Sequence, residues 1–240
     1  MPWGKLMFGA FGDVLFTILC YVYILLVIFV SGRLGKVLHV SRRVSRKFLH
    51  AMIGNLPFVL PFFSSNVYPV LVAAPFILAT FLMSPFSPFA GIRERFGELA
   101  DMTEEGHPLG PVFYAVSYTV LALFFASKPC VVAAGIFPMA YGDSAASLIG
   151  ERYGKTKYKL FVHKSLEGSA AMFLASFFSL AIGLVFFSQL YSFSVFEKIL
   201  AAFAAASVAT LVESFSPFGF DNLTVPVFSA LTFLLLDGGI

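Results

Sequence analysis

The chain has 240 residues, of which 59% are apolar and only 12% are charged, and its mean hydropathy is +0.89. A soluble domain carries about 25% charged residues and about 45–50% apolar ones. This shortage of charge excludes a water-exposed surface over most of the chain and predicts a polytopic membrane protein. The net charge is +3 and the two cysteines, Cys20 and Cys130, lie in or beside apolar runs. We therefore expect no nucleic-acid partner, no disulfide framework and no cysteine metal cluster.

Apolar runs that approach the length of about 20 residues needed to cross a bilayer recur along the chain. The expected spans are residues 11–30, 49–63, 67–83, 111–126, 129–148, 169–187, 196–212 and 225–236. Some runs are short or contain proline, so eight spans, or seven with a re-entrant segment, both remain possible. The sequence predicts an all-α fold: one integral membrane domain over residues 1–240, built as a bundle of about 7–8 transmembrane helices.

Positive charge gathers in the connections between these spans. Of the 16 Lys and Arg residues, only Lys5, Lys128 and Lys198 fall outside the connections that follow the first, third and fifth spans. Basic loops are retained on the cytoplasmic side of membranes. We therefore expect these connections, and the one after the seventh span, to be cytoplasmic and to carry the chemistry.

A carboxylate stands at the end of the fifth span, where Asp143 lies between Gly142 and Ser144. An ionised group at membrane depth costs about 2.5–3.5 kcal/mol on insertion scales, so it must face protein, an ion or water. Gly142 permits a bend or the close approach of a ligand, and Ser144 leaves space beside the carboxylate. Asp143 is interpreted as a Mg²⁺ ligand or a general base. Pairing with a lysine for packing alone is the alternative.

A basic loop with spaced glycines follows this carboxylate. Gly150 and Gly154 free backbone amides to approach an anion, and Lys155, Lys157 and Lys164 supply positive charge. The pattern is typical of a loop that holds a polyphosphate. Attraction to anionic membrane lipids is an alternative explanation for the lysines.

The order of these residues resembles the signature of the CTP-dependent polyprenol kinases, the dolichol kinase and phytol kinase group. The pattern D-x-x-A-x-x-x-G-x-x-x-G followed by K-x-x-E-G is formed here by Asp143, Ala146, Gly150, Gly154, Lys164, Glu167 and Gly168. Three further stretches are similar to parts of that family: Arg46-Lys47-x-x-His50, residues 105–114, and Glu213 followed by Asp221-Asn222-x-x-Val225-Pro226. The resemblance covers roughly residues 46–226.

The resemblance implies an integral membrane enzyme that moves the γ-phosphate of CTP to the hydroxyl of a long-chain isoprenoid alcohol. The alcohol would be of the phytol, geranylgeraniol or dolichol type and would lie in the bilayer, with Mg²⁺ as cofactor. Phosphoryl transfer needs positioning, metal and positive charge more than covalent help from the protein. Asp143 and Asp221, with Asn222, are therefore expected to hold Mg²⁺ bridging the CTP phosphates.

The remaining roles follow from the same resemblance. Lys164, with Lys155 or Lys157, is expected to neutralise the β- and γ-phosphates. Glu167 or Glu213 would orient Lys164 or act as a base toward the alcohol. The catalytic set is thus Asp143, Lys164, Glu167 and Glu213. The nucleotide-binding set is Arg46, Lys47, His50, Gly142, Ser144, Gly150, Gly154, Lys155, Lys157, Gly168 and Asn222.

Several of these residues have structural alternatives. His50 suits an interfacial histidine that donates to a backbone carbonyl. A collar that binds lipid headgroups is the alternative for four basic residues together, and it suits Arg42 and Arg43 better than Arg46 and Lys47. Asp221 and Asn222 suit a helix N-cap.

Two other functions compete with the kinase. A CTP:phosphatidate cytidylyltransferase-like enzyme would make a CDP-lipid, but its C-terminal signature usually has a Lys-Asp pair and here Phe220 precedes Asp221. An ion-coupled transporter would use Asp143 and Glu213, yet the two halves of the chain show no related hydropathy. The oligomeric state and the length of the alcohol are not predicted.

Overall fold

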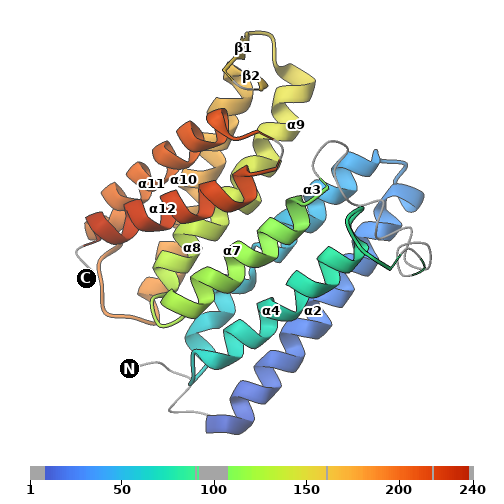
Figure 1. The fold of residues 1–240 in the computed structure, drawn as a ribbon. Helices are drawn as coiled ribbons and strands as arrows, with labels where there is room; N and C mark the ends of the chain where they lie inside the picture. Colours follow the sequence, from blue (N-terminus) through green and yellow to red (C-terminus); the bar gives the residue numbers. More distant parts are fainter. Residues whose placement is uncertain (1–8, 90, 92–107, 161, 218, 238–240) are drawn as a thin grey trace.

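The fold is an α-helical bundle, as the composition predicts, seen in a computed structural model that describes residues 9–89, 91, 108–160, 162–217 and 219–237 (Figure 1). In chain order its elements are α2 (Gly9–Val37), α3 (Arg42–Ile53), the 3₁₀ helix η1 (Leu56–Phe62), α4 (Val67–Met83), α7 (Gly110–Phe125), α8 (Pro129–Phe137), the π-helical turn η2 (Pro138–Gly142), α9 (Asp143–Tyr153), β1 (Lys157–Lys159), β2 (His163–Ser165), α10 (Leu166–Ser188), α11 (Val195–Phe215) and α12 (Asp221–Leu236).

Among the described residues, four helical stretches are long and apolar enough to cross a membrane: Gly9–Gly35, Pro129–Tyr153, Leu166–Ser188 and Val195–Phe215. Shorter apolar helices at Val67–Met83, Gly110–Phe125 and Asp221–Leu236 pack beside them. These lengths agree with the all-α membrane bundle that the sequence predicts. Residues 90 and 92–107 of the 84–110 connection lie outside the described residues, including the start of the 105–114 run.

The predicted span at 49–63 is wrong as a single helix. The chain turns at Gly54 after α3, and η1 begins with Pro57 in its first turn and contains Pro61. Proline lacks the N–H that an α-helix needs in its interior, so the apolar run divides into α3 and a short 3₁₀ segment. The fifth span is longer than predicted, because the helical path continues from α8 through η2 and α9 to Tyr153.

The core is centred on α8, in which Val131, Val132, Ala134 and Ile136 are at most 1% exposed. This helix packs against α7, α10, α12 and η1. The alanines of α11 pack against α10 and α12, and Ala201, Ala202, Ala205, Ala206 and Ala209 are all buried. Small residues let membrane helices approach closely, so the alanine cluster allows close packing of α11 against α10 and α12.

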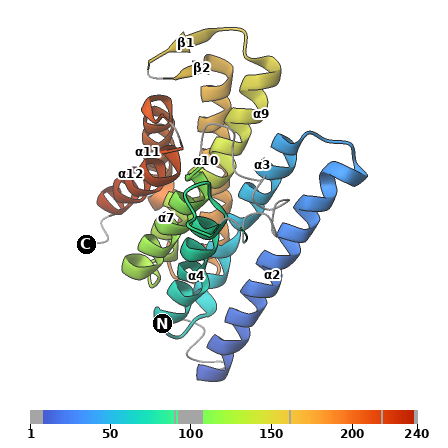
Figure 2. The same ribbon diagram turned by 45° about the vertical axis from the view of Figure 1, so that its right-hand side comes forward.

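One end of the bundle gathers the polar elements. The β1–β2 hairpin pairs Tyr158 with Lys164 and lies beyond the ends of α9 and α10, while α2 begins at the opposite end (Figures 1 and 2). The α2–α3 and α11–α12 connections lie toward the hairpin end in both views. Segments far apart in the sequence therefore meet there and form the candidate site.

Candidate active site

The first wall of the site begins at the π-helical turn η2, which directly precedes Asp143. Pro138 opens this turn, and π-turns inside helices are frequent at functional sites. The carbonyl oxygen of Met139 accepts a hydrogen bond from His50 Nε2 at 2.9 Å. Gly142 lies against α10, where a Cβ atom would collide with Ser176 Oγ and come within 2.7 Å of Met172 Sδ. Gly142 is therefore needed for close helix packing.

Helix α3 runs antiparallel to η2 and α9 along this wall. Lys47 Nζ lies 2.7 Å from Asp143 Oδ2, and Ser144 Oγ donates to the Lys47 carbonyl oxygen at 3.2 Å. His50 Nε2 lies 3.7 Å from the same Asp143 oxygen. Arg43 lies one turn before Lys47 on α3. Its guanidinium contacts Ser147 and Glu151, which lie one and two turns after Asp143 on α9. The face of α3 that carries these basic side chains therefore lies toward Asp143.

The second wall comes from the hairpin and from the adjoining ends of α11 and α12. Lys164 on β2 pairs with Glu213 Oε1 near the end of α11. Glu213 is 2% exposed, and its other oxygen, Oε2, is buried without a hydrogen-bond partner among the described residues. Burial is the largest single influence and lowers the pKa of Lys164, but the carboxylates of Glu213, Asp143 and Asp221 together raise it more, and the net pKa lies above the usual 10.5. Lys164 is therefore a cation at neutral pH.

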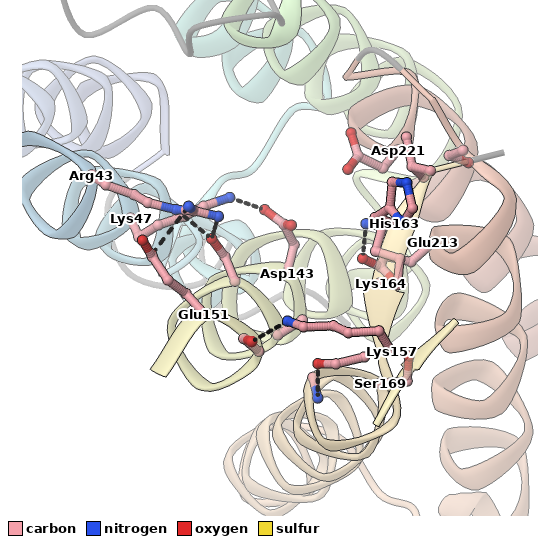
Figure 3. Close-up of a pocket in the computed structure, with 17 residues that line it drawn as sticks. Arg43, Lys47, Asp143, Glu151, Lys157, His163, Lys164, Ser169, Glu213 and Asp221 are labelled. Carbon is pink, nitrogen blue, oxygen red and sulfur yellow. Dashed lines mark hydrogen bonds and ion pairs between the residues drawn. The ribbon is translucent and has the colours of Figure 1, made fainter. Parts of the chain in front are cut away.

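A cavity of about 350 Å³ lies between these two walls (Figure 3). In the figure, Arg43, Lys47 and Asp143 face Lys164, Glu213 and Asp221 across it. Its lining consists of Arg43, Lys47, Asp143, Ala146, Ser147, Gly150, Glu151, Lys157, Val162, His163, Lys164, Ser165, Gly168, Ser169, Glu213, Ser216 and Asp221. Four cationic side chains from α3, β1 and β2 and four carboxylates from α9, α11 and α12 therefore share one cavity.

Half of the predicted site residues meet in this cavity. Those that line it are Lys47, Asp143, Gly150, Lys157, Lys164, Gly168, Glu213 and Asp221. Those that do not line it are Arg46, His50, Gly142, Ser144, Gly154, Lys155, Glu167 and Asn222. His50 and Ser144 each contact a residue that lines the cavity: His50 lies beside Asp143, and Ser144 donates to the Lys47 carbonyl oxygen.

Glu167 is placed at the base of the hairpin and not in the cavity. Its carboxylate accepts the Thr156 backbone N–H, with oxygens at 3.1 and 3.3 Å. This contact ties the start of α10 to the strand that carries Lys157. In this structure Glu167 orders the hairpin, while Glu213 is the carboxylate that holds Lys164.

The spaced glycines bring α9 close to the start of α10. Ser165 caps α10 by accepting the Gly168 N–H at 3.1 Å, and a Cβ on Gly154 would come within 2.6 Å of Ser165 Oγ. A Cβ on Gly168 would meet Ala146 O at 3.1 Å and Gly150 Cα at 3.2 Å. Gly150 and Gly168, which line the cavity, thus form its floor. The role of the glycine amides in anion binding remains a prediction.

The alternative interpretation of Asp221 and Asn222 as a helix N-cap is wrong for α12. The residue before the helix is Phe220, which has no side-chain capping bond, and Asp221 is the first helical residue. Asp221 Oδ1 accepts the Asn222 N–H at 2.9 Å, and the Asn222 carbonyl accepts Ser117 Oγ at 2.7 Å. Asn222 therefore fixes the start of α12 to α7, and Asp221 reaches the cavity.

The cavity also contains residues that the sequence analysis did not assign to it. These are Ala146, Ser147, Glu151, Val162, His163, Ser165, Ser169, Ser216 and, most prominently, Arg43. Arg43 is interpreted from sequence as part of a lipid-binding collar. Its spacing of four residues from Lys47 puts both on one face of a helix and was the available signal.

The donor set fits Mg²⁺ only in company with a phosphate ligand. Within the described part of the chain, no group of three or more His, Cys, Asp or Glu residues is close enough to hold a metal ion by itself. Asp143 and Asp221 both line the cavity, however, and Mg²⁺ is usually bound by one or two carboxylates plus substrate phosphates and water. The cavity thus offers carboxylates for such an ion and cations for the phosphates.

The fold and the cavity define an apolar helical bundle with a cavity lined by cations and carboxylates at one polar end. No family model matches the chain, and no solved structure gives a significant match. Curated relatives do. The chain is 35% identical over 191 residues to the phytol kinase of Synechocystis sp., a match that covers 78% of this chain and 77% of the relative.

Plant relatives extend the comparison. The chain is 29% identical over 212 residues to probable phytol kinase 1, chloroplastic, of Oryza sativa subsp. japonica, covering 83% of this chain and 66% of the relative. It is 26% identical over 214 residues to the chloroplastic farnesol kinase of Arabidopsis thaliana, covering 85% and 69%. The chain belongs to the polyprenol and phytol kinase family and is a lipid kinase that acts on an alcohol.

Proposed function

We propose that this chain is a multi-pass membrane kinase that transfers the γ-phosphoryl group of CTP to a long-chain isoprenoid alcohol of the phytol or geranylgeraniol type. The observation that carries the proposal is the cavity in which the Lys47–Asp143 and Lys164–Glu213 pairs face each other at the polar end of an apolar bundle. The names of the relatives, phytol kinase and farnesol kinase, support an isoprenoid acceptor. The resemblance of residues 143–168 to CTP-dependent polyprenol kinases supports CTP as donor.

The transfer forms a bond between the alcohol oxygen and the γ-phosphorus and breaks the bond from that phosphorus to the β–γ bridging oxygen. Lys164 and Lys157 neutralise phosphate oxygens, because both line the cavity as cations. Asp143 and Asp221 would hold Mg²⁺, which supplies further positive charge for the phosphates when bound. The products are the isoprenoid monophosphate and CDP.

The proton of the alcohol needs an acceptor inside the cavity. Glu213 suits this role, because its Oε2 atom is buried and has no hydrogen-bond partner among the described residues, while Oε1 is fixed by Lys164. A carboxylate held in this way accepts the hydroxyl proton as the oxygen attacks. Glu167 is less suited, because its carboxylate is engaged by the Thr156 N–H outside the cavity.

The location of the cavity suits an acceptor whose hydroxyl lies at the membrane surface and whose tail lies in hydrocarbon. The helices around it expose large apolar side chains such as Leu174, Phe178 and Ile182 on α10. We place the hairpin, the α2–α3 connection and the α11–α12 connection on the cytoplasmic side, since most of the lysines and arginines gather there.

The test uses purified full-length protein in detergent with γ-labelled CTP, Mg²⁺ and a panel of phytol, geranylgeraniol, farnesol and dolichol. We expect label in phytyl or geranylgeranyl monophosphate, loss of transfer with a chelator, and weaker transfer from ATP, GTP and UTP. Folded protein that labels none of the four alcohols would contradict the proposal. Release of pyrophosphate with formation of a CDP-lipid would assign a cytidylyltransferase instead.

A further inference from the structure

Arg43 is fixed at the cavity by contacts to all three of its guanidinium nitrogens. Nε and Nη2 donate to Ser147 Oγ at 3.1 and 2.9 Å, and Nη1 lies 3.1 Å from Glu151 Oε2. Both partners belong to α9, whereas Arg43 belongs to α3. All three residues line the cavity, as Figure 3 shows for Arg43 and Glu151.

From this arrangement we infer that Arg43 binds a phosphate oxygen of the nucleotide at the outer end of the cavity. We infer further that Glu151 competes for the guanidinium as a built-in anion that the nucleotide displaces. This inference rests on the proposed function, because it supposes that the cavity takes a nucleotide. It adds a specific residue pair that neither the family resemblance nor the relatives assign.

The basic side chains of α3 become more exposed from Lys47 to Arg43. The side chain of Lys47 is 7% exposed and that of Arg43 is 41% exposed, one helical turn nearer the surface. Four residues of helix span about 6 Å. If the γ-phosphate lies near Asp143 and Lys164, as proposed, a nucleotide that extends toward solvent would pass Lys47 and then Arg43. An arginine placed there meets a phosphate before the nucleoside reaches solvent.

The guanidinium group of Arg43 is chemically suited to bind phosphate. A guanidinium presents planar donors that match phosphate oxygens in a bidentate manner, which a lysine does not. Ser147 holds Nε and Nη2 and so fixes the plane of the guanidinium. The nitrogen that contacts Glu151 is Nη1, so displacement of this carboxylate exposes a donor that is already oriented.

The Arg43–Glu151 pair is easily broken. The Glu151 side chain is 58% exposed, and exposed ion pairs contribute little because water and salt screen them. A phosphate carries more charge and forms stronger charge-assisted hydrogen bonds than a surface carboxylate. A nucleotide can therefore replace Glu151, whereas the deeper Lys47–Asp143 pair is protected from solvent.

The test compares Arg43→Gln, Arg43→Lys and Glu151→Gln with wild type, by steady-state kinetics and by equilibrium binding of Mg-CTP. Arg43→Gln should raise the nucleotide KM and Kd about tenfold or more, the effect of one lost charge-assisted hydrogen bond. Arg43→Lys should recover only part of this loss. Glu151→Gln should lower both constants about two- to fivefold, the range for an exposed ion pair.

Arg152→Gln is the matched control for charge. Arg152 neighbours Glu151 on α9, stacks over the Tyr153 ring and does not line the cavity. Its replacement removes the same charge as Arg43→Gln, from the helix that carries Glu151, and we expect the nucleotide KM to change less than twofold. An equal rise in KM for Arg152→Gln and Arg43→Gln would show that only the net charge matters and would overturn the inference.

The double variant Arg43→Gln/Glu151→Gln tests the competition. Glu151→Gln should tighten nucleotide binding clearly in the wild-type background and much less when Arg43 is absent. Equal tightening in both backgrounds would overturn the role of Glu151 as a competitor. Unfolding midpoints for each variant separate a lost contact from a misfolded protein, and Arg43→Lys keeps the test open if Arg43→Gln does not fold.

The failure of this inference and that of the proposed function give different results. If wild type phosphorylates the alcohol and Arg43→Gln has an unchanged nucleotide KM and Kd, the inference is wrong and the kinase assignment stands. If wild type transfers no phosphate from CTP and binds no Mg-CTP, the proposed function is wrong, and the inference about Arg43 and Glu151 is wrong as well.

Discussion

Lys47 Nζ lies 2.7 Å from Asp143 Oδ2, and this ion pair joins α3 to the first turn of α9 at the edge of the cavity. The two side chains are 7% and 14% exposed, so the pair is largely removed from water. The carboxylate proposed to hold the metal therefore also stabilises the helix that carries Lys47. The sequence analysis treated packing with a lysine and catalysis as alternatives for Asp143, but the contact makes the two roles compatible.

Replacing Asp143 with Asn should abolish turnover and also destabilise the protein. Removing one partner of a buried ion pair costs about 3–5 kcal/mol, because the other charge stays buried without compensation. The double variant Lys47→Met/Asp143→Asn should regain much of the lost stability but no activity, since the uncompensated charge is gone while the proposed metal ligand is still missing. Thermal unfolding in detergent and CTP-dependent transfer measure the two effects separately. Near-normal turnover of Asp143→Asn would remove Asp143 from the catalytic set.

Glu213 and Glu167 offer a matched pair of carboxylates for locating the base. Glu213→Gln should lower kcat about 10²–10⁴-fold, the usual contribution of general acid–base catalysis. Glu167→Gln should lower kcat less than about tenfold, because an amide oxygen can still accept the Thr156 N–H. The nucleotide KM of both variants checks that binding is retained. Similar losses of kcat in the two variants would contradict the assignment of Glu213 as the base.

The raised pKa of Lys164 gives a pH dependence with a definite sign. Burial lowers this pKa, but Glu213, Asp143 and Asp221 together raise it more, so the folded value exceeds the unfolded value of 10.5. The stabilisation is therefore complete below pH 10.5 and is lost as the pH rises through the folded pKa. The difference in unfolding midpoint between wild type and Lys164→Met should be constant from about pH 7 to 9 and should shrink in stronger alkali. A difference that already shrinks across the neutral range would show that Lys164 is not held as a cation.

Most of the bundle could be predicted from hydropathy, because each apolar run has to satisfy its backbone groups as a helix. The predicted span 67–83 matches α4, and 111–126 matches α7 to within one residue at each end. Residues 49–63 could not be predicted this way. Their hydropathy is that of a span, whereas the interruption comes from local features, the turn at Gly54 and the prolines of η1.

Site residues that belong to the family motif could be predicted from the sequence. Site residues whose position depends on tertiary contacts could not. Lys164 and Glu213 are 49 residues apart, and no local pattern predicts that they form a pair. Arg43 was interpreted as a lipid contact because an arginine at a membrane surface usually is one, and only the packing of α3 against α9 turns it to the cavity. Glu167 belongs to the motif, yet its side chain points to the hairpin backbone.

The contact between Gly150 and Gly168 should tolerate no added methyl group. A Cβ on Gly168 would come within 3.0 Å of Ser165 Oγ and 3.1 Å of Ala146 O, so Gly168→Ala should force α9 away from α10 and cost about 1–3 kcal/mol. The floor of the cavity would shift with it, and the nucleotide KM should rise. Gly32→Ala is the matched control, because a Cβ on Gly32 meets nothing within 4 Å and alanine favours helix by about 1 kcal/mol. Unfolding midpoints and nucleotide KM for the two variants decide the matter: if Gly168→Ala behaves like Gly32→Ala, close packing of the glycines does not shape the site.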